Sequence, residues 1–173
     1  MGVQFPPGYR LERLCRQHRR SEFRCGDAKV DEWLATKAWR HQEKHLSVTK
    51  VLIKDRGGIA GYYTLATGQV DFGDLPLEVS KGLPRRMLPV AVLAWLGVDA
   101  RHHRQVLGGR LLAQALRDCW EAGATFPFIA VILDCTGEDS RAFYKHWEFK
   151  ELPGHPYRLF LSAAHLAAIV EHD

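Results

Sequence analysis

The apolar and polar positions of this chain repeat with two periods, one typical of helices and one typical of strands. Spacing of three or four residues predicts helices that each have one apolar face. These helices cover residues 27–45, 107–123, 138–146 and 162–170, with a short one near 77–81. Asp27 and Ser162 stand where a side-chain oxygen can cap the first N–H groups of a helix. Gly123 stands where helices commonly end.

Shorter apolar or alternating runs separate the helices and predict strands. The predicted strands cover residues 9–15, 47–54, 59–66, 90–98, 127–134, 147–152 and 157–161. The turn at 55–58 joins two of them as a hairpin, and the glycines and prolines of 73–89 predict a loop. This order of elements predicts an α/β (α+β layered) fold with a mixed central sheet flanked by helices, in a single domain over residues 1–173.

Composition places the chain among globular proteins, with 46% hydrophobic and 25% charged residues. No apolar run approaches the length of a membrane span and the first residues do not form a signal peptide, so we expect a cytoplasmic protein with no membrane partner. The four scattered cysteines, and His102 beside His103, have no spacing typical of a metal site, so we expect no metal and reduced thiols.

The net charge of +4 is unevenly distributed. Residues 1–56 contain 13 Lys or Arg against 7 Asp or Glu, whereas residues 57–100 contain 3 against 4 and residues 101–173 contain 8 against 9. A basic region of this kind attracts polyanions such as nucleic acid. A solubilising surface without a partner explains the charge equally well.

Residues 98–112 join a predicted strand to a predicted helix through an Arg-rich turn that contains Gly108 and Gly109. The first N–H groups of a helix have no partner within it, and the helix dipole is positive there, so such a turn can bind phosphate. The sequence is neither a Walker A loop nor a GxGxxG dinucleotide motif. Two glycines alone also fit a point where a helix packs closely on a strand.

The same turn, with the strand that ends Leu96-Gly-Val-Asp99, a second apolar strand and the segment 140–149, resembles the GNAT acetyltransferases over about residues 10–161. The resemblance implies the GNAT fold, with two splayed parallel strands near 90–98 and 127–134, and acetyl-CoA as co-substrate. It implies that backbone amides of the turn bind the coenzyme's pyrophosphate and that the first strand pairs with its pantetheine arm. The implied coenzyme-binding residues are Leu96, Gly97, Val98, His103, Arg104, Gln105, Val106, Leu107, Gly108 and Gly109. His103 and Val106 depart from the family's pattern.

Within this family the chain resembles the toxins of toxin–antitoxin pairs that acetylate aminoacyl-tRNA. Segments 23–27, 30–34, 61–65, 93–99 and 142–144 carry the resemblance. Trp95, Gly137 and Glu148 depart from it, where an Arg, an Asn and a Gly are usual. The resemblance implies aminoacyl-tRNA and a small DNA-binding antitoxin as partners, and a homodimer.

Acetyl transfer needs a neutral amine, support for an oxyanion and a proton for the departing thiolate. An α-amine has a pKa of about 7.7–8.0, so direct attack on the thioester needs no strong base. Tyr144 matches the family's general acid, with a packed helix tyrosine as the alternative, and a backbone N–H on the strand 96–98 matches its oxyanion donor. Cys135 has no paired histidine that would make it a nucleophile. The residues expected to contact RNA are Lys37, Arg40, Lys81, Arg85 and Arg86.

Two other functions remain open. The acceptor could be a small-molecule amine, a protein N-terminus or a lysine. The chain could instead be a non-catalytic GNAT-fold binding protein, because Val106 has a side chain where the family's phosphate-binding turn prefers none.

Overall fold

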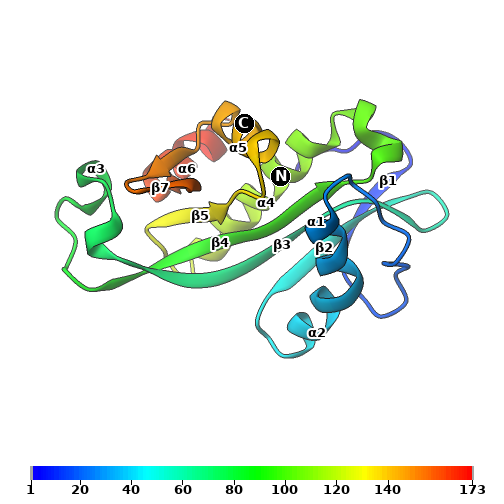
Figure 1. Ribbon diagram of the computed structural model, residues 1–173, viewed down its shortest axis with the longest axis horizontal. Coiled ribbons are helices and arrows are strands. Elements are labelled where there is room, and N and C mark those ends of the chain that lie inside the picture. The colour runs from blue at the N-terminus through cyan, green and yellow to red at the C-terminus, as the bar shows by residue number, and fades with distance from the viewer. Residues whose placement is uncertain (1, 173) are drawn as a thin grey trace. The chain divides into compact units, whose positions relative to one another are not determined.

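The computed structural model describes residues 2–172, apart from the side chain of Arg104. Within this range the chain forms strands and helices in the mixed order expected from the sequence (Figure 1). The strands are β1 (Tyr9–Arg13), β2 (Val48–Lys54), β3 (Gly58–Asp71), β4 (Met87–Val98), β5 (Ala130–Asp134), β6 (Lys150–Leu152) and β7 (His155–Ser162). The helices are α1 (Ala28–Glu32), α2 (Ala38–Glu43), α3 (Leu77–Ser80), α4 (Leu107–Gly123), α5 (Glu138–His146) and α6 (Ala163–Glu171). One π-helical turn, η1 (Trp33–Lys37), and two 3-10 turns, η2 (Phe72–Asp74) and η3 (Ala100–Gln105), complete the described elements.

The strands form one mixed sheet in the order β1-β2-β3-β4-β5-β7-β6. Strand β2 pairs antiparallel with β1 and β3, and β7 pairs antiparallel with β5 and β6. Strands β4 and β5 are parallel, with Ala91 opposite Val131 and Val92 opposite Ile132. The predicted mixed α/β fold with a parallel pair is therefore confirmed.

Contacts divide the chain into two compact units, and each is described by itself. Unit 1 contains the residues up to Ala66 together with Leu93–Ala115, and unit 2 contains Thr67–Val92 together with the residues from Leu116 onward. The long strands β3 and β4 and the helix α4 each contribute residues to both units. The single domain expected from the sequence stays a prediction.

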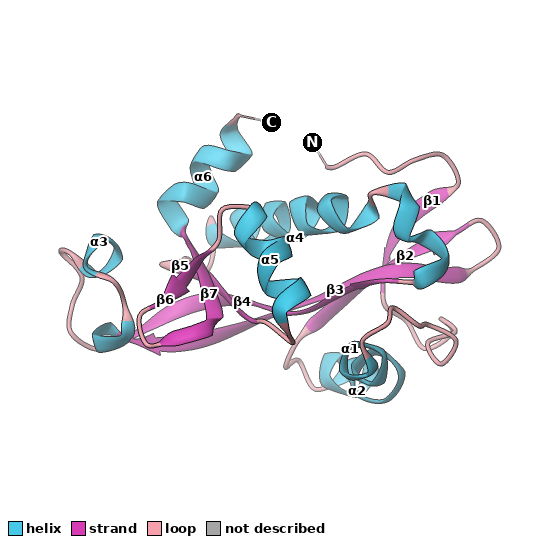
Figure 2. Ribbon diagram, turned by 45° about the horizontal axis from the view of Figure 1, so that its top comes forward, coloured by secondary structure: helices cyan, strands magenta, loops and turns pink. Residues whose placement is uncertain are grey.

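In unit 1, helices cover both faces of the sheet (Figure 2). On one face, α1, η1 and α2 pack on a core that includes Leu34, Val51 and Tyr62. On the other face lies the first half of α4. Gly61 permits this approach, because a Cβ on it would lie 2.6 Å from Cδ1 of Leu111.

Unit 2 has its own core on one face of its strands. Residues of β3, β4, β5, β6 and β7 meet there, and the segment that contains η2 and α3 packs against them. The buried members are Val70, Leu75, Leu88, Val90, Ala130, Ile132, Leu152 and Phe160. Ser162 caps α6 by accepting a hydrogen bond from the backbone N–H of His165, as the sequence predicts.

Several predicted boundaries are wrong because tertiary contacts decide them. β3 continues to Asp71, beyond the predicted end at residue 66, because Gly68 lets this stretch lie close to Val92 of β4 and Val70 is buried in the core of unit 2. β4 begins at Met87, inside the predicted loop, and β5 begins at Ala130 instead of 127. The helix predicted over 27–45 contains a π-helical turn, although Asp27 caps its start as expected. Among the described helices, none is long and apolar enough to cross a membrane.

Candidate functional site

The candidate phosphate turn runs from the end of β4 through η3 to the start of α4, all within unit 1. Its left-handed residue is Val106, with φ of 54° and ψ of 33°. Gly108 and Gly109 lie in the first turn of α4, inside the helix predicted over 107–123, so neither glycine is the left-handed residue of the turn. Val106 is 74% exposed, and a β-branched residue rarely adopts this conformation because its side chain crowds the backbone.

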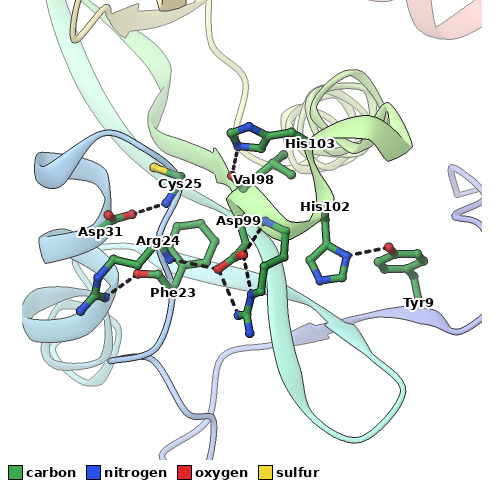
Figure 3. Close-up of polar contacts among 10 residues, drawn as sticks. Tyr9, Phe23, Arg24, Cys25, Asp31, Val98, Asp99, His102 and His103 are labelled. Carbon is green, nitrogen blue, oxygen red and sulfur yellow. Dashed lines mark hydrogen bonds and ion pairs between the residues drawn. The ribbon is translucent and has the colours of Figure 1, made fainter.

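Three sets of hydrogen bonds hold η3 in place (Figure 3). The Asp99 carboxylate accepts from the backbone N–H of Arg101 at 3.0 Å, which caps the start of η3. His102 Nδ1 lies 2.8 Å from the Tyr9 hydroxyl, and burial lowers the pKa of this histidine. His103 Nε2 lies 2.7 Å from the carbonyl oxygen of Val98. The turn is thus tied to β1 and to the end of β4.

The charge expected around this turn is partly engaged. Arg101 donates through Nε and a terminal nitrogen to the two oxygens of Asp99, at 2.8 and 3.2 Å. Arg110 donates to the backbone oxygen of Gln4. The side chain of Arg104 lies outside the described part of the chain. Two of the three arginines expected beside this turn, Arg101 and Arg110, thus already have partners within the chain.

The end of β4 presents the remaining coenzyme candidates. Leu96 and Val98 are half-buried, whereas Gly97 is buried. A Cβ on Gly97 would lie 2.7 Å from Cγ1 of Val30, so glycine is needed there for α1 to pack on β4. Leu107 is 1% exposed, so its side chain belongs to the core and only its backbone can serve a ligand.

Trp95 stands where the resemblance expects an arginine, and its surroundings explain the difference. Its ring stacks on Trp33, with ring centroids 5.4 Å apart and an angle of 15° between the planes. The indole nitrogen of Trp33 donates to the Thr64 hydroxyl at 3.0 Å, which sets the orientation of the stack. These rings pack against the core of unit 1 instead of carrying charge.

Tyr144, the candidate general acid, lies on α5 in unit 2. Its side chain is almost fully buried, with its ring edge-on to Phe143 at 5.1 Å and to Phe149 at 5.7 Å. Burial, with a smaller contribution from Cys135, raises the pKa of this phenol well above its usual value. Tyr144 therefore keeps its proton at physiological pH, as a general acid must.

The residues expected to contact RNA are all exposed, as such a role requires. Lys37 ends η1 and Arg40 lies in α2, both in unit 1. Lys81, Arg85 and Arg86 lie between α3 and β4 in unit 2, and the Arg85 guanidinium stacks over the ring of Phe72.

Asp99, to which no sequence motif assigns a role, lies at the centre of the turn. The sequence nevertheless indicates such a role. An aspartate directly after a strand is typical of a side chain that accepts a hydrogen bond from the backbone N–H two residues later and so closes a local turn.

Known proteins resemble this chain in sequence and in fold. The model of the acetyltransferase (GNAT) family matches residues 11–149. A protein named tRNA-acetylating toxin, from Mycobacterium tuberculosis (strain ATCC 25618 / H37Rv), is 29% identical over 150 residues, which are 87% of this chain and 89% of that protein.

Solved structures show the same fold. AtaT in complex with acetyl-methionyl-tRNAfMet superposes with a TM-score of 0.85 and 22% identity, covering 94% of this chain and 99% of AtaT. A Tyr-to-Phe mutant of the AtaT toxin, bound to the C-terminus of the antitoxin AtaR and to acetyl-CoA, has a TM-score of 0.79 and 18% identity and covers 94% and 98% of the two chains.

Proposed function

We propose, from the premise that this chain belongs to the GNAT acetyltransferase family, that it transfers an acetyl group from acetyl-CoA to the α-amine of an aminoacyl-tRNA. An acetylated α-amine cannot attack the ester of the peptidyl-tRNA on the ribosome, so this activity stops translation. The observation that carries the proposal is the β4–η3–α4 segment. Its turn is held by hydrogen bonds and directly precedes a 17-residue helix, whose first N–H groups have no partner within the helix. The tRNA-acetylating relative supports the choice of acceptor.

The coenzyme is assigned to the turn and to the end of β4. Backbone N–H groups of residues 105–109 bind the pyrophosphate, and Arg104 is the candidate for a further charged contact. The pantetheine arm pairs with Leu96, Gly97 and Val98 as an added strand would. His103 already occupies one side of the Val98 carbonyl oxygen, so the arm shares that oxygen or displaces the imidazole.

The reaction proceeds by direct attack. The neutral amine nitrogen forms a bond to the acetyl carbon, and a backbone N–H of the β4 end supports the oxyanion that develops. When the intermediate collapses, the carbon–sulfur bond breaks and Tyr144 gives its phenolic proton to the thiolate. The amine loses a proton to solvent, and Tyr144 regains one from solvent before the next turnover. Burial keeps the Tyr144 phenol protonated until the thiolate forms, and it also makes this phenol a weaker acid than an exposed tyrosine.

The acceptor is assigned to the exposed basic residues. Lys37, Arg40, Lys81, Arg85 and Arg86 contact RNA phosphates, which release counterions when they are neutralised. We assign two further partners by the same resemblance: a small DNA-binding antitoxin, and a second copy of this chain in a homodimer. The reaction takes place in the cytoplasm, where aminoacyl-tRNA is used.

The experiment that tests this function follows labelled acetyl groups from acetyl-CoA into RNA. Charged tRNA should become labelled, and the label should leave with the amino acid on mild alkaline hydrolysis of the ester. Label in uncharged tRNA, or only in proteins or small amines, contradicts the proposed acceptor. Titration calorimetry with acetyl-CoA separates the remaining case, because no binding would leave a GNAT-fold protein without this enzymatic activity.

A further inference from the structure

Asp99 is a buried carboxylate at the point where β4 ends, and it joins three segments of unit 1. One oxygen accepts from the backbone N–H of Arg24, at 3.0 Å, in the segment that leads into α1. The other accepts from the backbone N–H of Arg101, at 3.0 Å, in η3. Figure 3 shows this carboxylate between the two segments. Its side chain is therefore the common anchor of both.

The main chain around Asp99 reinforces this junction. Its own N–H donates to Ala60 of β3, and its carbonyl oxygen accepts from His102, each at 2.8 Å. The next residue, Ala100, donates to the carbonyl oxygen of Arg24 at 2.8 Å. Asp99 is 1% exposed, and a carboxylate so far from water is tolerated only where hydrogen bonds replace its hydration.

The other end of η3 is the strained residue of the turn. Val106 has a left-handed backbone, which costs an L-residue energy and persists only where the surrounding structure imposes it. The Asp99 cap holds the start of η3, and the buried Leu107 holds the start of α4. Without the cap, η3 could shift and Val106 could return to a relaxed conformation.

We infer that Asp99 is a positioning residue for the coenzyme. By fastening the start of η3, it keeps Val106 left-handed, and it thereby holds the N–H groups of residues 105–109 in the arrangement that binds the pyrophosphate. This inference rests on the proposed function, because it assumes that acetyl-CoA binds at this turn. It makes no claim that Asp99 touches the coenzyme.

The test measures the dissociation constant of acetyl-CoA by calorimetry. Asp99→Ala should raise it by about ten- to a hundredfold, because two backbone anchors are lost, and Asp99→Asn should raise it less. At saturating acetyl-CoA the turnover number should stay within about twofold of the unmodified chain, because the chemical step does not use Asp99. A general loss of folded protein would instead lower turnover and leave KM unchanged.

A double substitution tests the route through Val106. Glycine adopts the left-handed conformation without the cost that valine incurs, so Asp99→Asn should lower the affinity by at least about threefold less in the Val106→Gly background than in the unmodified chain. The matched control is Asp71→Asn. Asp71 caps η2 by accepting from Gly73 N at 2.9 Å, but it lies in unit 2, so acetyl-CoA affinity should not change.

The outcomes separate the two proposals. If the unmodified chain binds acetyl-CoA and Asp99→Ala binds it equally well, the positioning role is overturned and the proposed function stands. If the unmodified chain does not bind acetyl-CoA, both are overturned. If Asp99→Ala does not fold, Asp99→Asn decides. Unchanged acetyl-CoA affinity in Asp99→Asn contradicts the positioning role, and changes in affinity that simply add in the double variant contradict the coupling between Asp99 and Val106.

Discussion

Replacing Val106 by glycine is the most direct test of the coenzyme turn. The left-handed conformation of an L-residue costs roughly 1–2 kcal/mol, and glycine does not incur this cost. Glycine loses about 0.4–1 kcal/mol more in chain entropy on folding than a residue with a side chain. Val106 is 74% exposed, so removing its side chain forfeits only about 0.5 kcal/mol of burial. The expected net change is therefore close to zero or stabilising by about 0.5 kcal/mol.

The backbone conformation at residue 106 decides whether Val106→Gly raises or lowers the free energy of unfolding. In an ordinary helical or extended conformation, the same substitution lowers the stability of a protein by about 0.5–1 kcal/mol. For a chain of this size that would lower Tm by roughly 1–4 °C, whereas we expect Tm to be unchanged or to rise slightly. Acetyl-CoA should also bind severalfold more tightly, because phosphate can approach a backbone without a side chain.

Scanning calorimetry gives Tm and titration calorimetry gives the affinity. Val106→Ala should not have a higher Tm than Val106→Gly, because alanine retains most of the left-handed cost. Glu148→Gly is a matched control, since Glu148 also has a left-handed backbone, with φ of 72°, but lies in unit 2. It should leave acetyl-CoA affinity unchanged. A fall in Tm by several degrees for Val106→Gly would refute the strained turn.

Three further predictions concern other parts of the proposed site. Tyr144→Phe should lower turnover by on the order of a hundredfold without changing acetyl-CoA affinity. The control Tyr157→Phe, on the exposed part of β7, should leave turnover unchanged, and equal turnover in the two variants would remove Tyr144 from the mechanism. Replacing Arg85 and Arg86 by glutamine should weaken binding of charged tRNA and reduce the slope of log affinity against log salt by roughly 1.5, and an unchanged slope would place the RNA elsewhere. Although burial acts to raise the pKa of Asp99, hydrogen bonds from Arg101 and the backbone of Arg24 lower it to about 2. Because the pKa of Asp99 is lower in the folded state than in the unfolded state, its carboxylate should stabilise the fold by about 2 kcal/mol above roughly pH 4 and lose that contribution towards pH 2. The stability of Asp99→Asn, measured by urea denaturation, should therefore depend less on pH in this range than that of the unmodified chain.

Much of the fold could be predicted because local patterns carry it. The apolar stripe of Val30, Leu34 and Ala38 is buried as the spacing requires, and α5 occupies the predicted residues. Asp27 and Ser162 cap their helices because capping depends on a short side chain beside the first N–H groups, which is a local property.

The strand boundaries could not be predicted in the same way. Residues 67–71 include a glycine and only one apolar residue, Val70, and they form a strand because β4 lies beside them. Trp95 and Gly97 likewise depend on partners from distant parts of the chain. One stacks on Trp33, and the other leaves room for Val30.

The candidate site divides in the same way. By itself the sequence determined that a basic strand-to-helix turn stands at 98–112, that Tyr144 lies on a short helix, and that both resemble parts of an acetyltransferase. Only the tertiary structure decided that Val106, and not the glycine pair, takes the left-handed position, and that Asp99 anchors the turn. The physical reason is that these features depend on groups far apart in the sequence. Arg24, Ala60 and Tyr9 meet the turn only after the sheet has formed.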